Sequence, residues 1–128
     1  MIVLDSGILI AYANPDDAHH RGVMAFLGDA SDESFSITAL TLAEALIHPV
    51  RANVVGGMVK VIATLGLYVE DLREQDAVPL ARVRAATGLT LPDALVIHTA
   101  ECFGGSVATT DARLAAAAES RGLVGHQI

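Results

Sequence analysis

Short apolar segments alternate along this chain with longer segments of helical periodicity, and this alternation restricts the possible folds more than any other feature. Short apolar runs bounded by polar residues are typical of buried strands. The predicted strands are MIVL at 1–4, SFSI at 34–37, LYVEDL at 67–72 and SVAT at 106–109. Strands that alternate with helices form parallel sheets covered by helices on both faces. We therefore expect an α/β fold with a mostly parallel sheet, in a single domain over residues 1–128.

The intervals between these strands read as helices. The predicted helices are GILIAYA at 7–13, AHHRGVMAFLGDA at 18–30, TALTLAEALIHPV from 38 to its break at Pro49, NVVGGMVKVIATLG at 53–66, EQDAVPLARVRAATG at 74–88, TLPDALVIHTAECF at 90–103 and ARLAAAAESRG at 112–122. Proline interrupts a helix interior, and Gly88 is suited to end a helix in the left-handed conformation. No element is predicted for the last segment, LVGHQI at 123–128.

Composition excludes some classes of function. The net charge is −7, from 15 acidic and 8 basic residues, which argues against a broad phosphate-binding surface unless bound cations reverse the local sign. Hydrophobic residues make up 52% of the chain without any run of membrane-spanning length, which predicts a partner or self-association surface and no membrane insertion. The single cysteine, Cys102, excludes an internal disulfide, and we expect a cytoplasmic protein.

Two aspartates come directly after predicted strands. Asp5 follows MIVL, and Asp111 follows SVAT after two threonines. In open parallel sheets, the carboxyl ends of the strands are where ligands and catalytic groups gather. Each aspartate is equally well suited to cap the helix that follows it, so both interpretations stay open for either residue.

Two further acids lie on helix faces that look apolar. Glu44 shares its face with Leu40 and Ile47, so it should lie near a cation or at the edge of the core. Asp93 lies in an apolar arc at the first turn of its helix, although Thr90 and Asp93 also match a capping box. Four convergent carboxylates would form a hard, oxygen-rich site suited to Mg²⁺ or Mn²⁺.

The histidines and the cysteine are weaker candidates. His19 and His20 are adjacent and would diverge on a helix, and His48 and His98 read as residues at the boundary of the core. Cys102 has no companion at zinc-ligand spacing, so the sequence predicts no zinc site.

The segments VLDSG at the start, TLAEAL around Glu44, LPDALVIHTA around Asp93 and VATTD ending at Asp111 together resemble the PIN-domain ribonuclease family. The similarity is greatest to VapC-type toxins of bacterial toxin–antitoxin pairs, and it covers nearly the whole chain in the family's order and spacing. Gly7 departs from the family, which often has a polar residue there.

This resemblance implies a three-layer α/β/α sandwich and a Mg²⁺- or Mn²⁺-dependent endoribonuclease that hydrolyses RNA phosphodiester bonds. Asp5, Glu44, Asp93 and Asp111 would be its catalytic, metal-binding acids, and the small hydroxyl residues Ser6 and Thr109 would support them. It also implies a homodimer inhibited by a VapB-type antitoxin. The alternative is a catalytically inactive PIN-like module that serves only as a binding partner.

Overall fold

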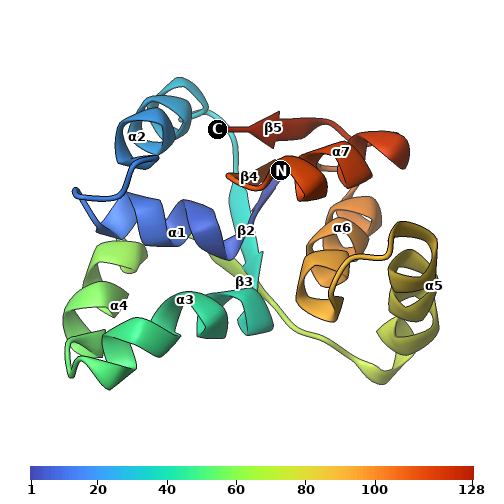
Figure 1. Ribbon diagram of the computed structural model, residues 1–128, viewed down its shortest axis with the longest axis horizontal. Helices are drawn as coiled ribbons and strands as arrows, with labels where there is room; N and C mark the ends of the chain where they lie inside the picture. The colour runs from blue at the N-terminus through green and yellow to red at the C-terminus, as the bar shows by residue number, and fades with distance from the viewer.

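The computed structural model describes all 128 residues and confirms the α/β architecture (Figure 1). Five strands form one sheet in which every neighbouring pair is parallel. The strands are β1 (Ile2–Leu4), β2 (Phe35–Thr38), β3 (Tyr68–Glu70), β4 (Ser106–Thr109) and β5 (Gly125–Gln127). The helices are α1 (Ser6–Ala13), α2 (His20–Asp29), α3 (Ala39–Arg51), α4 (Val55–Ala63), α5 (Ala77–Thr87), α6 (Leu91–Phe103) and α7 (Ala112–Ser120), with a 3-10 turn η1 (Glu74–Asp76) before α5. No helix combines the length and the hydropathy that a bilayer crossing requires.

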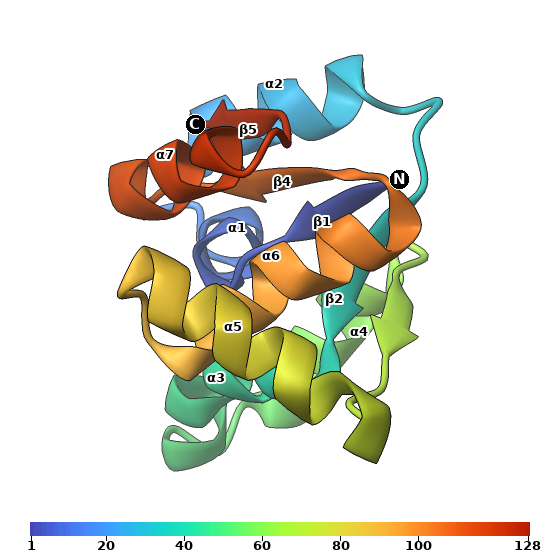
Figure 2. The ribbon, with the colours of Figure 1, turned by 90° about the vertical axis from the view of Figure 1, so that its right-hand side faces the viewer.

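The sheet has an apolar core on each of its two faces, which gives the molecule three layers (Figures 1 and 2). Successive side chains of a strand point to opposite faces, so Ile2 and Leu4 enter one core and Val3 enters the other. Helices α1 to α4 cover the first core, and α5, α6 and α7 cover the second. Helix α6 is buried from Ala94 to Ala100, which explains why its sequence is almost entirely apolar.

The strand order is β3-β2-β1-β4-β5, with the first strand in the centre. The chain builds the sheet outward from β1 on one side through β2 and β3, and then returns to add β4 on the other side. The carboxyl ends of β1 and β4 therefore form the point at which the winding direction changes, where open parallel sheets bind their ligands. Asp5 follows β1 and Asp111 follows β4, so both strand-end acids lie at this edge.

The helix predictions are confirmed with one correction. Gly88 ends α5 with a left-handed φ of 69°, and Val23 and Leu27 are the buried side chains of α2. The prediction that Pro49 breaks α3 is wrong, because the helix continues to Arg51. Pro49 falls in the last turn, where only one intrahelical bond is lost, and its ring is buried.

The C-terminal strand β5 was not predicted. It is a short segment with glycine and polar residues, and it carries none of the apolar character by which strands are recognised in a sequence. Its pairing depends on backbone groups: Gly125 and His126 stand opposite Val107 and Ala108 of β4. The ladder bond from the Ile128 N–H to the Thr109 carbonyl, 3.0 Å, ties this strand to the end of β4.

Substitution of Gly125 tests how closely β5 packs on α7. A β-carbon at Gly125 would lie 2.6 Å from the carbonyl oxygen of Ala115, which is backbone and cannot turn aside. Gly125→Ala should therefore lower the free energy of unfolding by about 1–3 kcal/mol. The control, Gly28→Ala in α2, meets nothing within 4 Å and should raise it by up to about 1 kcal/mol. Urea denaturation measures both, and equal stability of the two variants would contradict this packing.

Candidate active site

Asp5 is held at the junction of β1 and α1 by two hydrogen bonds, one on each carboxylate oxygen. The Ser6 backbone N–H donates to Oδ1 at 2.7 Å, and the Thr109 hydroxyl donates to Oδ2 at 2.8 Å. Asp5 is thus the N-cap of α1, and it is 7% exposed. Burial raises the pKa of the Asp5 carboxyl, the two hydrogen bonds oppose this rise, and the charge of Asp111 adds to it.

Thr109 connects Asp5 to Asp111. Its buried hydroxyl donates to Asp5 and accepts a hydrogen bond from the Asp111 backbone N–H at 2.9 Å. The exposed Asp111 carboxylate in turn accepts from the Arg113 N–H at 2.8 Å and caps α7. The capping interpretation therefore holds for both strand-end aspartates. It does not compete with a shared site, because both caps lie at the same edge of the sheet.

Asp93 lies in the first turn of α6, and its backbone rather than its carboxylate takes part in the cap. The Asp93 N–H donates to the Thr90 hydroxyl at 3.4 Å, but the return bond of a capping box, from the Thr90 N–H to the Asp93 carboxylate, is not formed. The half-buried carboxylate has a raised pKa, first because of burial and then because of the charge of Asp5. Thr90 and Arg113 oppose this rise, and Asp111 adds to it.

Glu44 lies at the edge of the core, but the prediction about its helix face is wrong. Leu40 and Ile47 are 43% and 49% exposed, and the buried stripe of α3 consists of Thr41, Ala45 and Pro49. A helix with apolar residues on both sides does not reveal its core face by angle alone. Glu44 is half-buried, and its pKa is raised by burial, then by the charges of Asp5 and Asp93.

The four acids come from four separate elements and influence one another through their charges. None of them takes part in an ion pair. No three of them offer oxygens that lie mutually within 4.8 Å, so they do not form a ready-made shell of direct ligands around one bare ion. Mg²⁺ keeps several of its waters and is usually held by one or two carboxylates, so this unpaired oxygen set fits Mg²⁺ or Mn²⁺.

Gly7 lies beside this cluster, and the structure gives a reason for its lack of a side chain. A β-carbon there would lie 2.5 Å from the Thr110 hydroxyl oxygen and 3.9 Å from Oδ2 of Asp5. A side chain at this position would therefore require the Thr110 hydroxyl to move.

The raised pKa values predict how stability depends on pH when divalent ions are removed. An acid whose folded-state pKa is raised holds its proton more tightly in the folded protein than in the unfolded chain. Its contribution to stability is present below the unfolded pKa, near 4, and is lost as the pH rises through the folded pKa. In EDTA, Asp93→Asn should therefore gain stability relative to the wild type as the pH rises from about 4 to 7. Urea unfolding at several pH values measures this gain. A stability difference between the two proteins that does not change with pH would argue against a raised pKa of Asp93.

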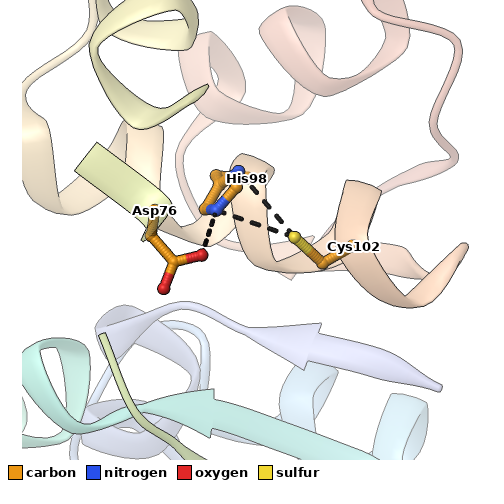
Figure 3. Close-up of side chains that lie close together, drawn as sticks. All are labelled: Asp76, His98 and Cys102. Carbon is orange, nitrogen blue, oxygen red and sulfur yellow. Dashed lines mark hydrogen bonds and ion pairs between the residues drawn. The ribbon is translucent and has the colours of Figure 1, made fainter. Parts of the chain in front are cut away.

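The structure brings together a second group of potential metal ligands that the sequence did not indicate. Asp76, His98 and Cys102 offer ligand atoms that all lie within 4.8 Å of one another (Figure 3). His98 is not a boundary residue, because it is buried with 6% of its surface exposed. Cys102 is not isolated from other potential metal ligands, because Asp76 and His98 lie beside it. The available signal was the spacing of His98 and Cys102, four residues apart on one helix face, whereas Asp76 is brought in from another element.

Comparisons with known proteins show which family and which solved structures this chain is similar to. Residues 2–120 match the PIN domain family. The structure is similar to that of VapC20 from Mycobacterium tuberculosis, a toxin that cleaves the sarcin–ricin loop, with a TM-score of 0.79, 14% identity and coverage of 100% of both chains. A toxin–antitoxin complex from Klebsiella pneumoniae matches with a TM-score of 0.76, 19% identity and the same full coverage.

PAE2754 from Pyrobaculum aerophilum matches with a TM-score of 0.63 and 26% identity, over 91% of this chain and 78% of the other. No curated protein sequence is significantly similar to this chain. The family match nevertheless extends from β1 to the end of α7 and includes all four acids of the cluster. This chain belongs to the PIN domain family.

Proposed function

We propose that this protein is a Mg²⁺- or Mn²⁺-dependent endoribonuclease that acts as the toxin of a type II toxin–antitoxin pair. The observation that carries the proposal is the convergence of Asp5, Glu44, Asp93 and Asp111, none of them in an ion pair, at the edge where β1 and β4 end. A structural cluster of acids would normally include a neutralising Lys or Arg in contact, since unpaired carboxylates repel one another.

The four acids would hold the ion, which would lower the pKa of a water molecule and neutralise charge on the phosphodiester. The residues around them prepare this site. Thr109 and the Ser6 backbone fix both oxygens of Asp5, so that this carboxylate keeps its orientation. Because the Thr90 side chain caps α6 by accepting from the Asp93 N–H, the Asp93 carboxylate is not needed to start the helix.

Three helix N-termini lie at the same edge and stabilise the negative charge of the acids. Asp5 caps α1, Asp111 caps α7 and Asp93 lies in the first turn of α6. The backbone N–H groups and the helix dipoles at these ends favour charged carboxylates. Attraction of the RNA phosphates would come from the bound ion, which reverses the local sign even though the net charge of the chain is −7.

The partners in this proposal are RNA, a VapB-type antitoxin and a second copy of the chain. Apolar side chains remain exposed on α3, on α4 and at the start of α4, as the composition predicts for a partner surface. They include Leu40, Ile47, Val50, Val54, Val59 and Val61, which are 41–57% exposed. Apolar exposure of this extent on two adjacent helices supports docking of a protein partner. VapC20 cleaves the sarcin–ricin loop, which supports RNA as a partner. The Klebsiella pneumoniae relative is part of a toxin–antitoxin complex, which supports an antitoxin as a partner.

The test is cleavage of RNA by the purified chain with Mg²⁺, with Mn²⁺ and in EDTA. Substrates are a sarcin–ricin stem-loop, tRNA and total cellular RNA, so that an unexpected target is still detected. The proposal expects discrete fragments that disappear in EDTA. Intact RNA under all conditions would instead favour the alternative, a catalytically inactive PIN-like binding module.

A further inference from the structure

Asp76, His98 and Cys102 form a compact group on the second face of the sheet, built by residues other than the four acids (Figure 3). His98 and Cys102 lie one turn apart on α6, and Asp76 lies at the end of η1, where α5 begins. The side chains of His98 and Asp76 are 8% and 20% exposed, while Cys102 faces solvent. The group borders a cavity of about 230 Å³ that Glu70 and Asp71 also line.

Asp76 approaches one nitrogen of the imidazole ring, whereas the sulfur of Cys102 is almost equally distant from both. Oδ1 of Asp76 lies 2.9 Å from Nε2 of His98, and Sγ of Cys102 lies 3.6 Å from Nε2 and 3.9 Å from Nδ1. A nucleophilic Cys–His–Asp relay requires the acid and the thiol at opposite nitrogens of the ring. Burial, together with the charges of Asp76 and Glu101, also raises the pKa of the Cys102 thiol. A nucleophilic cysteine is therefore a poor fit to this geometry.

We propose that Asp76, His98 and Cys102 bind one Zn²⁺ ion, with water as the fourth ligand. Tetrahedral zinc with bonds of about 2.3 Å to sulfur and 2.0–2.1 Å to nitrogen places those two ligands roughly 3.5 Å apart, close to the 3.6 Å between Sγ and Nε2. The exposed side chain of Cys102 would have to turn so that Sγ faces the lone pair of Nε2. The oxygen and nitrogen ligands of such an ion are roughly 3.4 Å apart, so Asp76 needs to move by only about 0.5 Å from its present hydrogen bond.

The surroundings prepare the three side chains for this role. The Arg73 backbone N–H donates to the other oxygen of Asp76 at 2.8 Å and so orients the carboxylate, as outer hydrogen bonds do for metal ligands. On binding, the Cys102 thiol gives its proton to solvent and the thiolate becomes the ligand. The proton that Nε2 donates to Asp76 in the present hydrogen bond is lost to solvent, and His98 binds through Nε2 as the tautomer that carries its proton on Nδ1. A set of one sulfur, one nitrogen and one oxygen selects Zn²⁺ over Mg²⁺, which separates this site chemically from the four acids.

Cobalt substitution tests the site directly, because a thiolate ligand gives Co²⁺ a charge-transfer absorption in the near ultraviolet. The protein is prepared without a histidine tag and titrated with Co²⁺ and then with Zn²⁺. We expect one equivalent of Co²⁺ to produce the band and Zn²⁺ to abolish it. Because Cys102 is the only cysteine, Zn²⁺ should also slow its reaction with a thiol reagent such as DTNB.

Variants separate this site from the acidic cluster. Cys102→Ala should remove the band and weaken Zn²⁺ binding more than about tenfold, and Asp76→Asn should weaken binding to a similar degree. His48→Gln, which lies outside the group, should bind Zn²⁺ as the wild type does, and Asp93→Asn should keep the Co²⁺–thiolate band because that band reports only the ion at Cys102. Cys102 is exposed, so its truncation leaves the fold intact, and this variant alone decides the question if Asp76→Asn does not fold. Absence of the band in the wild type, or unchanged Zn²⁺ affinity of Cys102→Ala, would overturn the proposal.

Discussion

Asp93→Asn is expected to lower metal-dependent RNA cleavage by about a thousandfold while the protein remains folded. Loss of a charged metal ligand removes several kcal/mol of transition-state stabilisation, and each 1.36 kcal/mol corresponds to a tenfold change in rate. The amide has nearly the same size as the carboxylate, and the α6 cap uses the backbone N–H of residue 93, which the substitution keeps. The measurement is the initial rate of fragment formation with saturating Mn²⁺.

The matched control is Asp29→Asn, the same isosteric change at an exposed residue at the end of α2. It should cleave RNA at the wild-type rate. Circular dichroism of both variants establishes that the fold is kept. If Asp93→Asn retains full activity, Asp93 has no part in the chemistry and only Asp5, Glu44 and Asp111 remain as candidate ligands.

The second large expected effect is a gain in stability on addition of Mn²⁺. A ligand that binds only the folded state, present at a hundred times its dissociation constant, contributes about 2.7 kcal/mol. For a chain of this size, that corresponds to a rise in Tm of roughly 10 °C. Burial first, and then the charges of neighbouring acids, raise the pKa values of Asp5, Glu44 and Asp93, and a bound ion would stabilise their charged forms against both effects.

Asp93→Asn should lose most of this stabilisation, whereas Asp29→Asn should keep it. Differential scanning calorimetry in EDTA and at increasing Mn²⁺ concentrations separates the two cases. An aspartate that served only to start the helix would show the same metal response before and after substitution. Cys102→Ala should respond to Mn²⁺ as the wild type does, because a thiolate contributes little to binding this hard ion.

Much of the acidic cluster is predictable because the direction of a parallel strand fixes which of its ends carries the ligands. Asp5 and Asp111 follow apolar segments, and that position alone predicts that they lie at one edge of the sheet. Glu44 is different. Its helix α3 is apolar on both sides, so the angle pointed to Leu40 and Ile47 as core residues, although both are exposed. Only packing against α1 and β2 decides which side of such a helix is buried.

The elements that were missed share one physical property, which is that their contacts are not encoded in local hydrophobicity. Strand β5 is held by backbone hydrogen bonds to β4, and backbone groups are the same for every sequence. His98 is polar yet buried, because Asp76 from η1 satisfies its ring nitrogen. The helical periodicity of α6 assigns His98 to the solvent-exposed side, because periodicity cannot detect a hydrogen-bond partner 22 positions away in the sequence.

The sequence by itself determined the alternation of strands and helices, the four acids and the residues that begin and end the helices. These features depend on local periodicity and capping chemistry, which are readable within a few residues. The tertiary structure decided which of these residues share a site. Thr109 reaches Asp5 across 104 positions of sequence because β1 and β4 are neighbours in the sheet, and Asp76 reaches His98 because η1 and α5 pack on α6. Such contacts depend on how whole elements pack, and no local pattern carries that information.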